Sequence, residues 1–107
     1  MIVSILTRKT RLQDRAQWQS KLESVLPRIR EVLGEQSGFV SLQYLWGADE
    51  AGQTAQITAW KSLEDCRRYV REGAAATIAT IEDAVVPTAA HPEGAWVRTT
   101  YEVAAGK

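Results

Sequence analysis

Cysteine and histidine are nearly absent from this sequence. Its 107 residues include one cysteine, Cys66, and one histidine, His91. A single cysteine excludes an intramolecular disulfide, and a single histidine excludes a metal site built from several imidazole ligands. We therefore expect neither a disulfide framework nor a bound metal in this protein.

An excess of charge of one sign is also missing, as is any long apolar run. Lysine plus arginine number 13 and aspartate plus glutamate number 13, so the formal net charge is zero. Nucleic-acid-binding domains usually carry a basic face. A transmembrane helix needs about 18 or more consecutive apolar residues, and a secretory signal places its basic residues before its apolar stretch, whereas residues 1–8 have the reverse order. The sequence thus predicts a cytoplasmic protein with no nucleic-acid or membrane partner.

The residues that are present form the pattern of one domain over residues 1–107, a typical length for a single domain. Segments rich in β-branched, aromatic and other apolar residues predict strands at 1–8, 38–46, 54–60 and 95–103. A polar turn segment at 47–53 joins the second strand to the third and predicts a β-hairpin.

Two helical regions complete the pattern. The first follows a capping residue, Asp14, and ends at Gly34. The second follows the cap Ser62, is broken at Gly73 and resumes over 74–86. The order β-α-β-β-α-β predicts a ferredoxin-like α+β sandwich with an antiparallel four-stranded sheet. Right-handed crossovers place both helical regions on one face, with the first and third strands in the centre.

Apolar side chains nevertheless occur on both faces of the predicted sheet. In the second strand, alternation puts Phe39 and Leu45 opposite Val40, Leu42, Tyr44 and Trp46. In the last strand it puts Trp96 opposite Val97, Tyr101 and Val103. One layer of helices covers only one face, so we expect the other face to meet the sheet of a second copy in a homodimer.

Two short segments carry a resemblance to a known family. Ser-Gly-Phe-Val-Ser at 37–41 and Trp-Lys-Ser-Leu-Glu-Asp at 60–65, within this layout, resemble the antibiotic biosynthesis monooxygenase domain over about residues 2–103. The resemblance implies a dimeric α+β barrel, in which two ferredoxin-like sheets pack face to face. The alternative interpretation of Gly38, Phe39 and Trp60 is purely structural, because aromatic residues readily serve as core.

The resemblance also implies a reaction. Cofactor-free members of the family oxidise polyphenolic or quinol-like compounds: the ionised substrate itself donates an electron to oxygen, so no cofactor is needed. Trp60 matches the family's strand tryptophan, which would wall a flat substrate, and Gln56 lies where an asparagine is found. An amide there would donate to a phenolate or to reduced oxygen. The chain departs from the family pattern at two positions. Cys66 falls near the position at which the family has a tyrosine that donates a proton, and Thr80 falls near the position at which it has a basic residue.

Haem-degrading members of the family bind haem through a histidine on the second helical region. Residues 74–79 read Ala-Ala-Ala-Thr-Ile-Ala, and His91 lies in the loop before the last strand. We therefore expect that haem is not the substrate.

Three further residues complete the candidate site. Tyr69 lies on the apolar side of the second helical region, where a buried hydroxyl needs a partner. Thr58 shares a strand face with Gln56 and Trp60. Arg98 either binds an acidic substrate or forms an ion pair with Glu102.

Two questions stay open at this stage. The first is which face of the strand at 54–60 meets the helices: if it is the face with Ala55, Ile57 and Ala59, the proposed site disappears. The function itself is either a cofactor-independent monooxygenation of a small aromatic or quinol-type compound, with Gln56, Trp60 and Tyr69 as catalytic residues, or non-catalytic binding of a small ligand on the same fold. The residues assigned to substrate binding are Thr58, Cys66 and Arg98.

Overall fold

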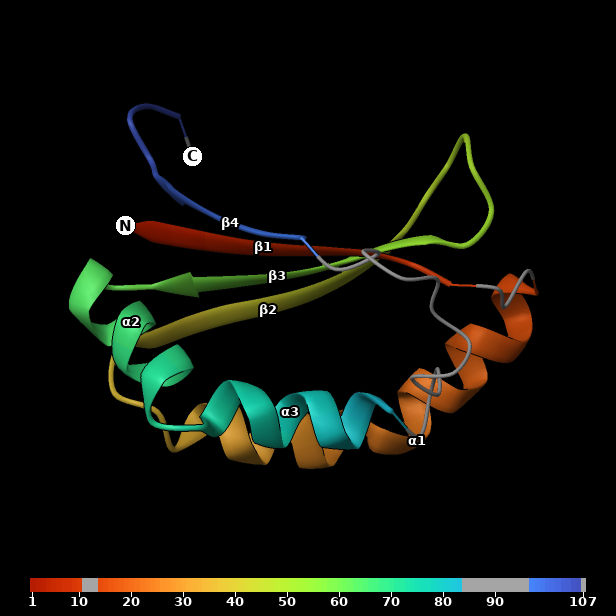
Figure 1. Ribbon diagram of the computed structural model, residues 1–107, viewed down its shortest axis with the longest axis horizontal. Coiled ribbons are helices and arrows are strands. Elements are labelled where there is room, and N and C mark those ends of the chain that lie inside the picture. The colour runs from red at the N-terminus through yellow and green to blue at the C-terminus, as the bar shows by residue number, and fades with distance from the viewer. Residues whose placement is uncertain (11–13, 84–96, 107) are drawn as a thin grey trace.

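Three helices lie against one face of a four-stranded antiparallel sheet (Figure 1). The structure is a computed structural model, and it describes residues 1–10, 14–83 and 97–106. The elements in chain order are β1 (Ile2–Lys9), α1 (Arg15–Gly34), β2 (Phe39–Trp46), β3 (Gln53–Trp60), α2 (Leu63–Arg71), α3 (Ala74–Glu82) and β4 (Val97–Glu102). The strand order β2-β3-β1-β4 confirms the ferredoxin-like prediction and the central position of the first and third strands.

The helices begin where the sequence predicts. The side chain of Asp14 accepts from the backbone N–H of Gln17 at 3.2 Å, and Ser62 Oγ accepts from the N–H of Asp65 at 3.1 Å. Gly73, at φ +89°, separates α2 from α3. The predicted continuation of this region to residue 86, the first two residues of the last predicted strand and His91 lie outside the described residues.

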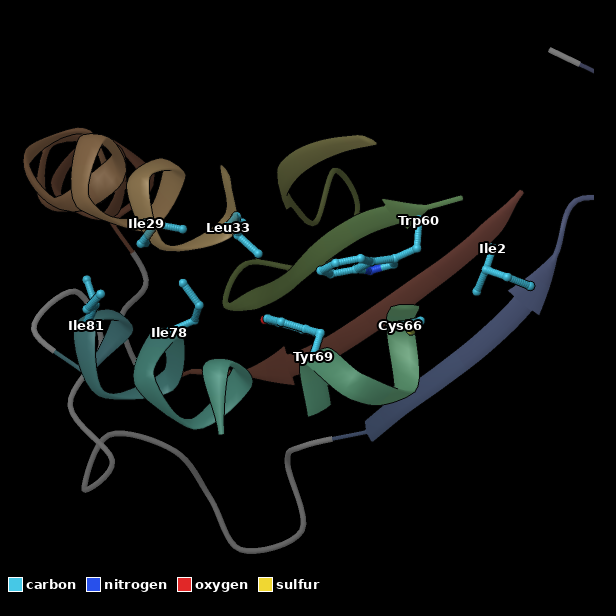
Figure 2. Packing of buried hydrophobic residues seen from close by; sticks show 8 residues of the cluster. All are labelled: Ile2, Ile29, Leu33, Trp60, Cys66, Tyr69, Ile78 and Ile81. Carbon is cyan, nitrogen blue, oxygen red and sulfur yellow. The ribbon is translucent and has the colours of Figure 1, made fainter. Parts of the chain in front are cut away.

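The core fills the space between the sheet and the helices. Figure 2 shows buried side chains from β1, β3 and all three helices converging there, with the rings of Trp60 and Tyr69 next to each other and tilted by 30°. A second cluster lies near the start of α1, where Trp18 packs 5.1 Å from the ring of Trp46. No helix within the described ranges is long and apolar enough to cross a membrane.

A β-bulge at the start of β2 corrects the predicted facing of its first residues. The register with β3 shifts between Phe39 and Ser41. The extra residue reverses the alternation on one side of the bulge, so Phe39 packs on the core beside Trp60, at 5.7 Å between ring centres. Val40, predicted to share a face with Leu42, is exposed instead.

The two segments that carry the family resemblance are neighbours in space. Gly38 has φ +78°, and a Cβ at this position would collide with the side chain of Asp65. The N–H of Lys61 donates to the carbonyl of Gly38 at 2.8 Å, and Phe39 pairs with Trp60 across the strands. These contacts give Gly38, Phe39 and Trp60 a structural role at the junction of β2, β3 and α2.

We expect Gly38→Ala to destabilise the fold more than Gly73→Ala. Both glycines have positive φ, which costs an alanine about 1–2 kcal/mol. Only at Gly38 does the added methyl also displace Asp65, whereas nothing lies within 4 Å of a Cβ at Gly73. Urea denaturation of the two variants measures the difference. Equal losses of stability would show that the contact with Asp65 is unimportant.

The face of the sheet away from the helices has no covering element among the described residues (Figure 1). Alternate residues of β1 and β3 point to it, among them Ile5 and Ile57, which pair with each other. Three further apolar side chains point to this face, because they pair with the outward-facing residues of β1 and β3. They are Leu45 of β2 and Val97 and Tyr101 of β4, and each is about half exposed.

Candidate functional site

The helix-facing row of β3 carries the predicted site residues. Gln56, Thr58 and Trp60 are all buried beneath the helices, each at most 1% exposed. The alternative in which the opposite face of β3, with Ala55 and Ile57, meets the helices is therefore wrong. The burial of two uncharged polar side chains in this row requires partners for them inside the protein.

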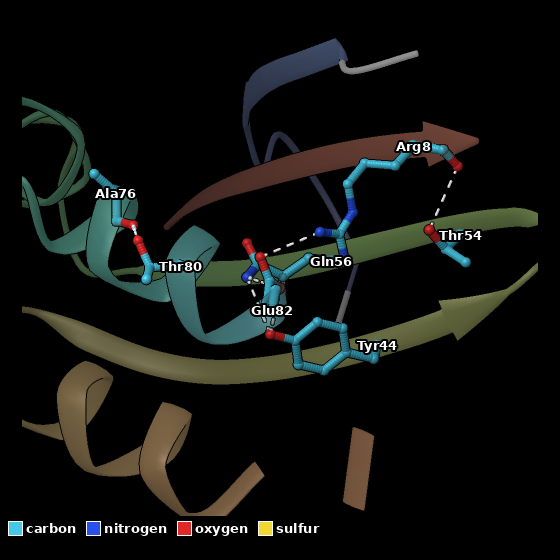
Figure 3. A network of polar contacts seen from close by, with 7 residues as sticks. All are labelled: Arg8, Tyr44, Thr54, Gln56, Ala76, Thr80 and Glu82. Atoms are coloured by element: carbon cyan, nitrogen blue, oxygen red, sulfur yellow. Dashed lines mark hydrogen bonds and ion pairs between the residues drawn. The ribbon is translucent and has the colours of Figure 1, made fainter. Parts of the chain in front are cut away.

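Gln56 belongs to a buried polar network around Glu82, the last residue of α3 (Figure 3). The Glu82 side chain is 3% exposed. Its Oε1 lies 3.3 Å from Nη1 of Arg8, and its Oε2 accepts from the hydroxyl of Tyr44 at 2.6 Å and from Nε2 of Gln56 at 2.9 Å. Burial, and then the negative charge of Glu82, raise the pKa of Tyr44, which keeps its hydroxyl a donor.

This network fixes which way the Gln56 amide points. Nε2 donates to the carboxylate of Glu82 and, at 3.2 Å, to the hydroxyl oxygen of Tyr44. Oε1 is buried and has no hydrogen-bond partner among the described residues. The sequence predicts that Gln56 donates to a ligand; the geometry instead leaves it a free acceptor.

Tyr69 presents a second buried oxygen. Its ring packs on Trp60 with 4.7 Å between ring centres, and the side chain is 1% exposed. Within the part of the chain that the structure describes, its hydroxyl has no hydrogen-bond partner. Burial raises the pKa of Tyr69 to about 12, against the opposing effect of the nearby Arg98 charge. The hydroxyl is therefore protonated at neutral pH and available to donate.

Gln56 and Tyr69 meet in one cavity of about 280 Å³ between the sheet and α2 and α3. This is slightly smaller than the roughly 300–1,000 Å³ of most small-molecule pockets. Small side chains on α3 leave the space open, as the run of alanines in the sequence suggests. The remaining lining residues are Leu6, Ala75, Ala76, Ile78, Ala79, Glu82 and Arg98.

Trp60 and Thr58 do not line this cavity. Nε1 of Trp60 donates to Oγ1 of Thr58 at 2.9 Å, so the two polar atoms satisfy each other. Trp60 lies behind the ring of Tyr69 and supports it, which corrects the expectation that it forms a wall of the same cavity. A catalytic role for Trp60 and a binding role for Thr58 remain predictions without a contact that supports them.

Arg98 lines the cavity from β4. Its Nη1 donates to Oγ of Ser4 at 2.8 Å, and its guanidinium carbon is 6.0 Å from the centre of the Tyr69 ring. Cys66 lies outside the cavity, in a neighbouring groove of about 500 Å³ between α2 and β4 that Arg98 also lines. Burial raises the pKa of the Cys66 thiol, so it is protonated at neutral pH.

The sequence did not predict three members of the polar network as site residues: Arg8, Tyr44 and Glu82. A weak signal exists for two of them. Arg8 continues the every-second-residue row of buried positions in β1, and Glu82 follows Ile78 by four residues on the core side of α3. A charged residue in a buried row indicates a charged partner, but the sequence does not show which one. Among the described residues, no group of three acidic, cysteine or histidine side chains could hold a metal.

Comparisons with known proteins identify the fold. Neither a family model nor a curated protein matches the sequence. Among solved structures, SnoaB, a cofactor-independent oxygenase from Streptomyces nogalater, is 20% identical over 98% of this chain and 95% of its own, with a TM-score of 0.63.

Two further solved structures extend this similarity. The monooxygenase ActVA-Orf6 of Streptomyces coelicolor, in complex with nanaomycin D, is 18% identical over 99% of this chain and 89% of its own, with a TM-score of 0.68. The haem degrader MhuD of Mycobacterium tuberculosis, with two haems in its active site, is 16% identical over 100% and 99%, with a TM-score of 0.67. The chain shares the fold of these proteins, which confirms the resemblance at the level of the fold.

Proposed function

We propose that this protein is a cofactor-independent monooxygenase that oxidises a small hydroxylated aromatic compound. One observation carries the proposal. Gln56 and Tyr69 line one cavity, and each has a buried oxygen, Oε1 and the hydroxyl respectively, without a partner among the described residues. Buried polar groups are normally satisfied, so such atoms indicate a polar ligand. SnoaB is described as a cofactor-independent oxygenase and ActVA-Orf6 as a monooxygenase, and the fold that they share with this chain supports the same reaction.

The reaction needs no group besides the substrate and oxygen. A phenol with a free ring position loses its hydroxyl proton, and the electron-rich ring reduces O₂. One oxygen atom becomes a new ring carbonyl, and the other takes up the hydroxyl proton and the hydrogen of the oxidised ring position and leaves as water, so that the phenol becomes a quinone. The four electrons that O₂ accepts all come from the substrate.

The cavity residues fit this sequence of steps. Gln56 Oε1 accepts a hydrogen bond from a substrate hydroxyl and orients the ring. The Tyr69 hydroxyl donates to the substrate oxygen that becomes negative, and such a donor stabilises the developing charge more in a dry site than in water. Leu6, Ile78 and the alanines of α3 supply the apolar walls for a ring.

Tyr69→Phe is expected to lower oxygen consumption with 1,5-dihydroxynaphthalene at least ~10-fold, or ~1.4 kcal/mol of transition-state stabilisation. The variant removes one oxygen from the cavity and keeps the ring on Trp60. An oxygen electrode and the absorbance of the quinone product measure the rate, and ¹⁸O₂ labels the new carbonyl.

Tyr101→Phe is the matched control, since it removes a tyrosine hydroxyl from the opposite face of the sheet. It should leave the rate unchanged. Equal rates in Tyr69→Phe and wild-type protein, with intact circular dichroism, would contradict the role of Tyr69. Tight binding of the substrate with no oxygen uptake by the wild-type protein would favour the non-catalytic ligand-binding alternative.

The proposal includes a homodimer formed through the uncovered face of the sheet. The apolar side chains of this face, including Ile5, Ile57, Leu45, Val97 and Tyr101, have no covering element among the described residues. A stable interface of this kind buries about 2,000 Å² or more in total. Sedimentation equilibrium should give twice the chain mass of 11.9 kDa. A monomer that persists at tens of micromolar would contradict it.

We expect no haem complex despite the shared fold with MhuD. Haem iron needs an axial donor, and none of the described helical residues is a histidine. Tyr69 and Cys66, the candidate donors nearest the cavity, are almost fully buried. A haem titration should therefore give no stoichiometric Soret shift. A tight one-to-one complex that releases iron on reduction would overturn this expectation.

A further inference from the structure

We infer that Arg98 binds a carboxylate of the substrate, so that the cavity selects a hydroxylated aromatic acid over its neutral analogues. This inference rests on the proposed function, because it assigns a substrate class to the same cavity. Three observations support it: the charge of Arg98, the groups that Arg98 contacts, and its position between the cavity and the groove.

The charge of Arg98 is not balanced by a carboxylate among the described residues. Its hydrogen-bond partner there is the neutral hydroxyl of Ser4, and the face of the Tyr69 ring lies 6.0 Å from its guanidinium carbon. The alternative drawn from the sequence, an ion pair with Glu102, is not formed: Glu102 is exposed and no ion pair joins it to Arg98.

The other charges of the cavity cancel. Glu82 is the acidic residue of the lining, and Arg8 pairs with it at 3.3 Å. Arg98 therefore leaves one positive charge on the cavity wall. A partly buried guanidinium is best satisfied by a carboxylate, which it can hold through two parallel hydrogen bonds. The contacts with Ser4 and Tyr69 hold the guanidinium in place for this.

The position of Arg98 makes it reachable from outside. It lines both the inner cavity and the groove between α2 and β4, whose apolar rim includes the exposed side chains of Leu63 and Val70. Gln56 Oε1 and the Tyr69 hydroxyl, by contrast, are fully buried. An aromatic acid that enters from the groove thus places its ring in the cavity, its hydroxyl at the buried oxygens and its carboxylate at the partly exposed Arg98.

The test measures binding without turnover, by anaerobic isothermal titration calorimetry on the full chain. The probes are 1-hydroxy-2-naphthoate and its methyl ester, which differ in charge but not in ring system. The wild-type protein should bind the acid at least ~10-fold more tightly than the ester, as expected for hydrogen bonds to a charged group. Arg98→Gln should abolish this preference, while Arg98→Lys should retain part of it.

Arg71→Gln is the matched control, because it removes a positive charge from the same groove at a residue already paired with Glu64 at 3.2 Å. It should keep the preference for the acid. The inference is overturned if wild type does not bind the acid, if acid and ester bind equally, or if Arg98→Gln binds the acid as wild type does. Oxygen uptake with 1,5-dihydroxynaphthalene tests the oxidation separately, so either claim can fail alone.

Discussion

Glu82→Gln should lower the free energy of unfolding by about 3–5 kcal/mol, the usual cost of removing one partner of a buried ion pair. The substitution keeps the size of the side chain but removes the charge that faces Arg8, whose side chain is 5% exposed. It also weakens the acceptor that Tyr44 and Gln56 share. Urea denaturation followed by circular dichroism measures the loss.

Two variants separate the buried charge from other effects. Arg8→Met combined with Glu82→Gln removes both charges and should recover about 2 kcal/mol of the loss, because a buried pair replaced as a whole often costs little. Glu64→Gln removes an exposed carboxylate that pairs with Arg71, and it should cost less than about 1 kcal/mol. A Glu82→Gln variant as stable as Glu64→Gln would mean that the network contributes nothing to folding.

Ile57→Glu should convert the proposed dimer into monomers at micromolar concentration. Ile57 lies near the middle of β3 and points to the uncovered face of the sheet, opposite Ile5 of β1. A carboxylate buried at the centre of an apolar interface costs several kcal/mol. Since each 1.4 kcal/mol is a factor of ten, the dissociation constant should rise ~100-fold or more. Sedimentation velocity across a concentration series measures it.

Ser20→Glu serves as the control for this experiment. Ser20 is exposed on α1, in the helical layer, so the same charge is added on the side away from the proposed interface. This variant should keep the dimer. If Ile57→Glu and wild type have the same mass at every concentration, the uncovered face is not the interface.

The fold could be predicted because its signals are local. The caps Asp14 and Ser62 and the break at Gly73 act on backbone groups within a few residues, and the strands follow from short apolar segments. The bulge at Phe39 could not be predicted in this way. It depends on the packing of that ring against Trp60, 21 positions later in the chain, and the extra residue reverses the alternation that the prediction used.

The sequence by itself therefore determined the order of the elements, the one-sided helical layer and the shared strand face of Gln56 and Trp60, but it left open whether that face meets the helices. Only the tertiary structure decided what these residues do. Glu82 finds Gln56 across 26 positions, Tyr44 across 38 and Arg8 across 74. Because these partners meet only after the chain has folded, periodicity shows that each is buried but not which group satisfies it. That pairing directs the amide nitrogen of Gln56 at Glu82 and Tyr44 and leaves the amide oxygen without a partner among the described residues.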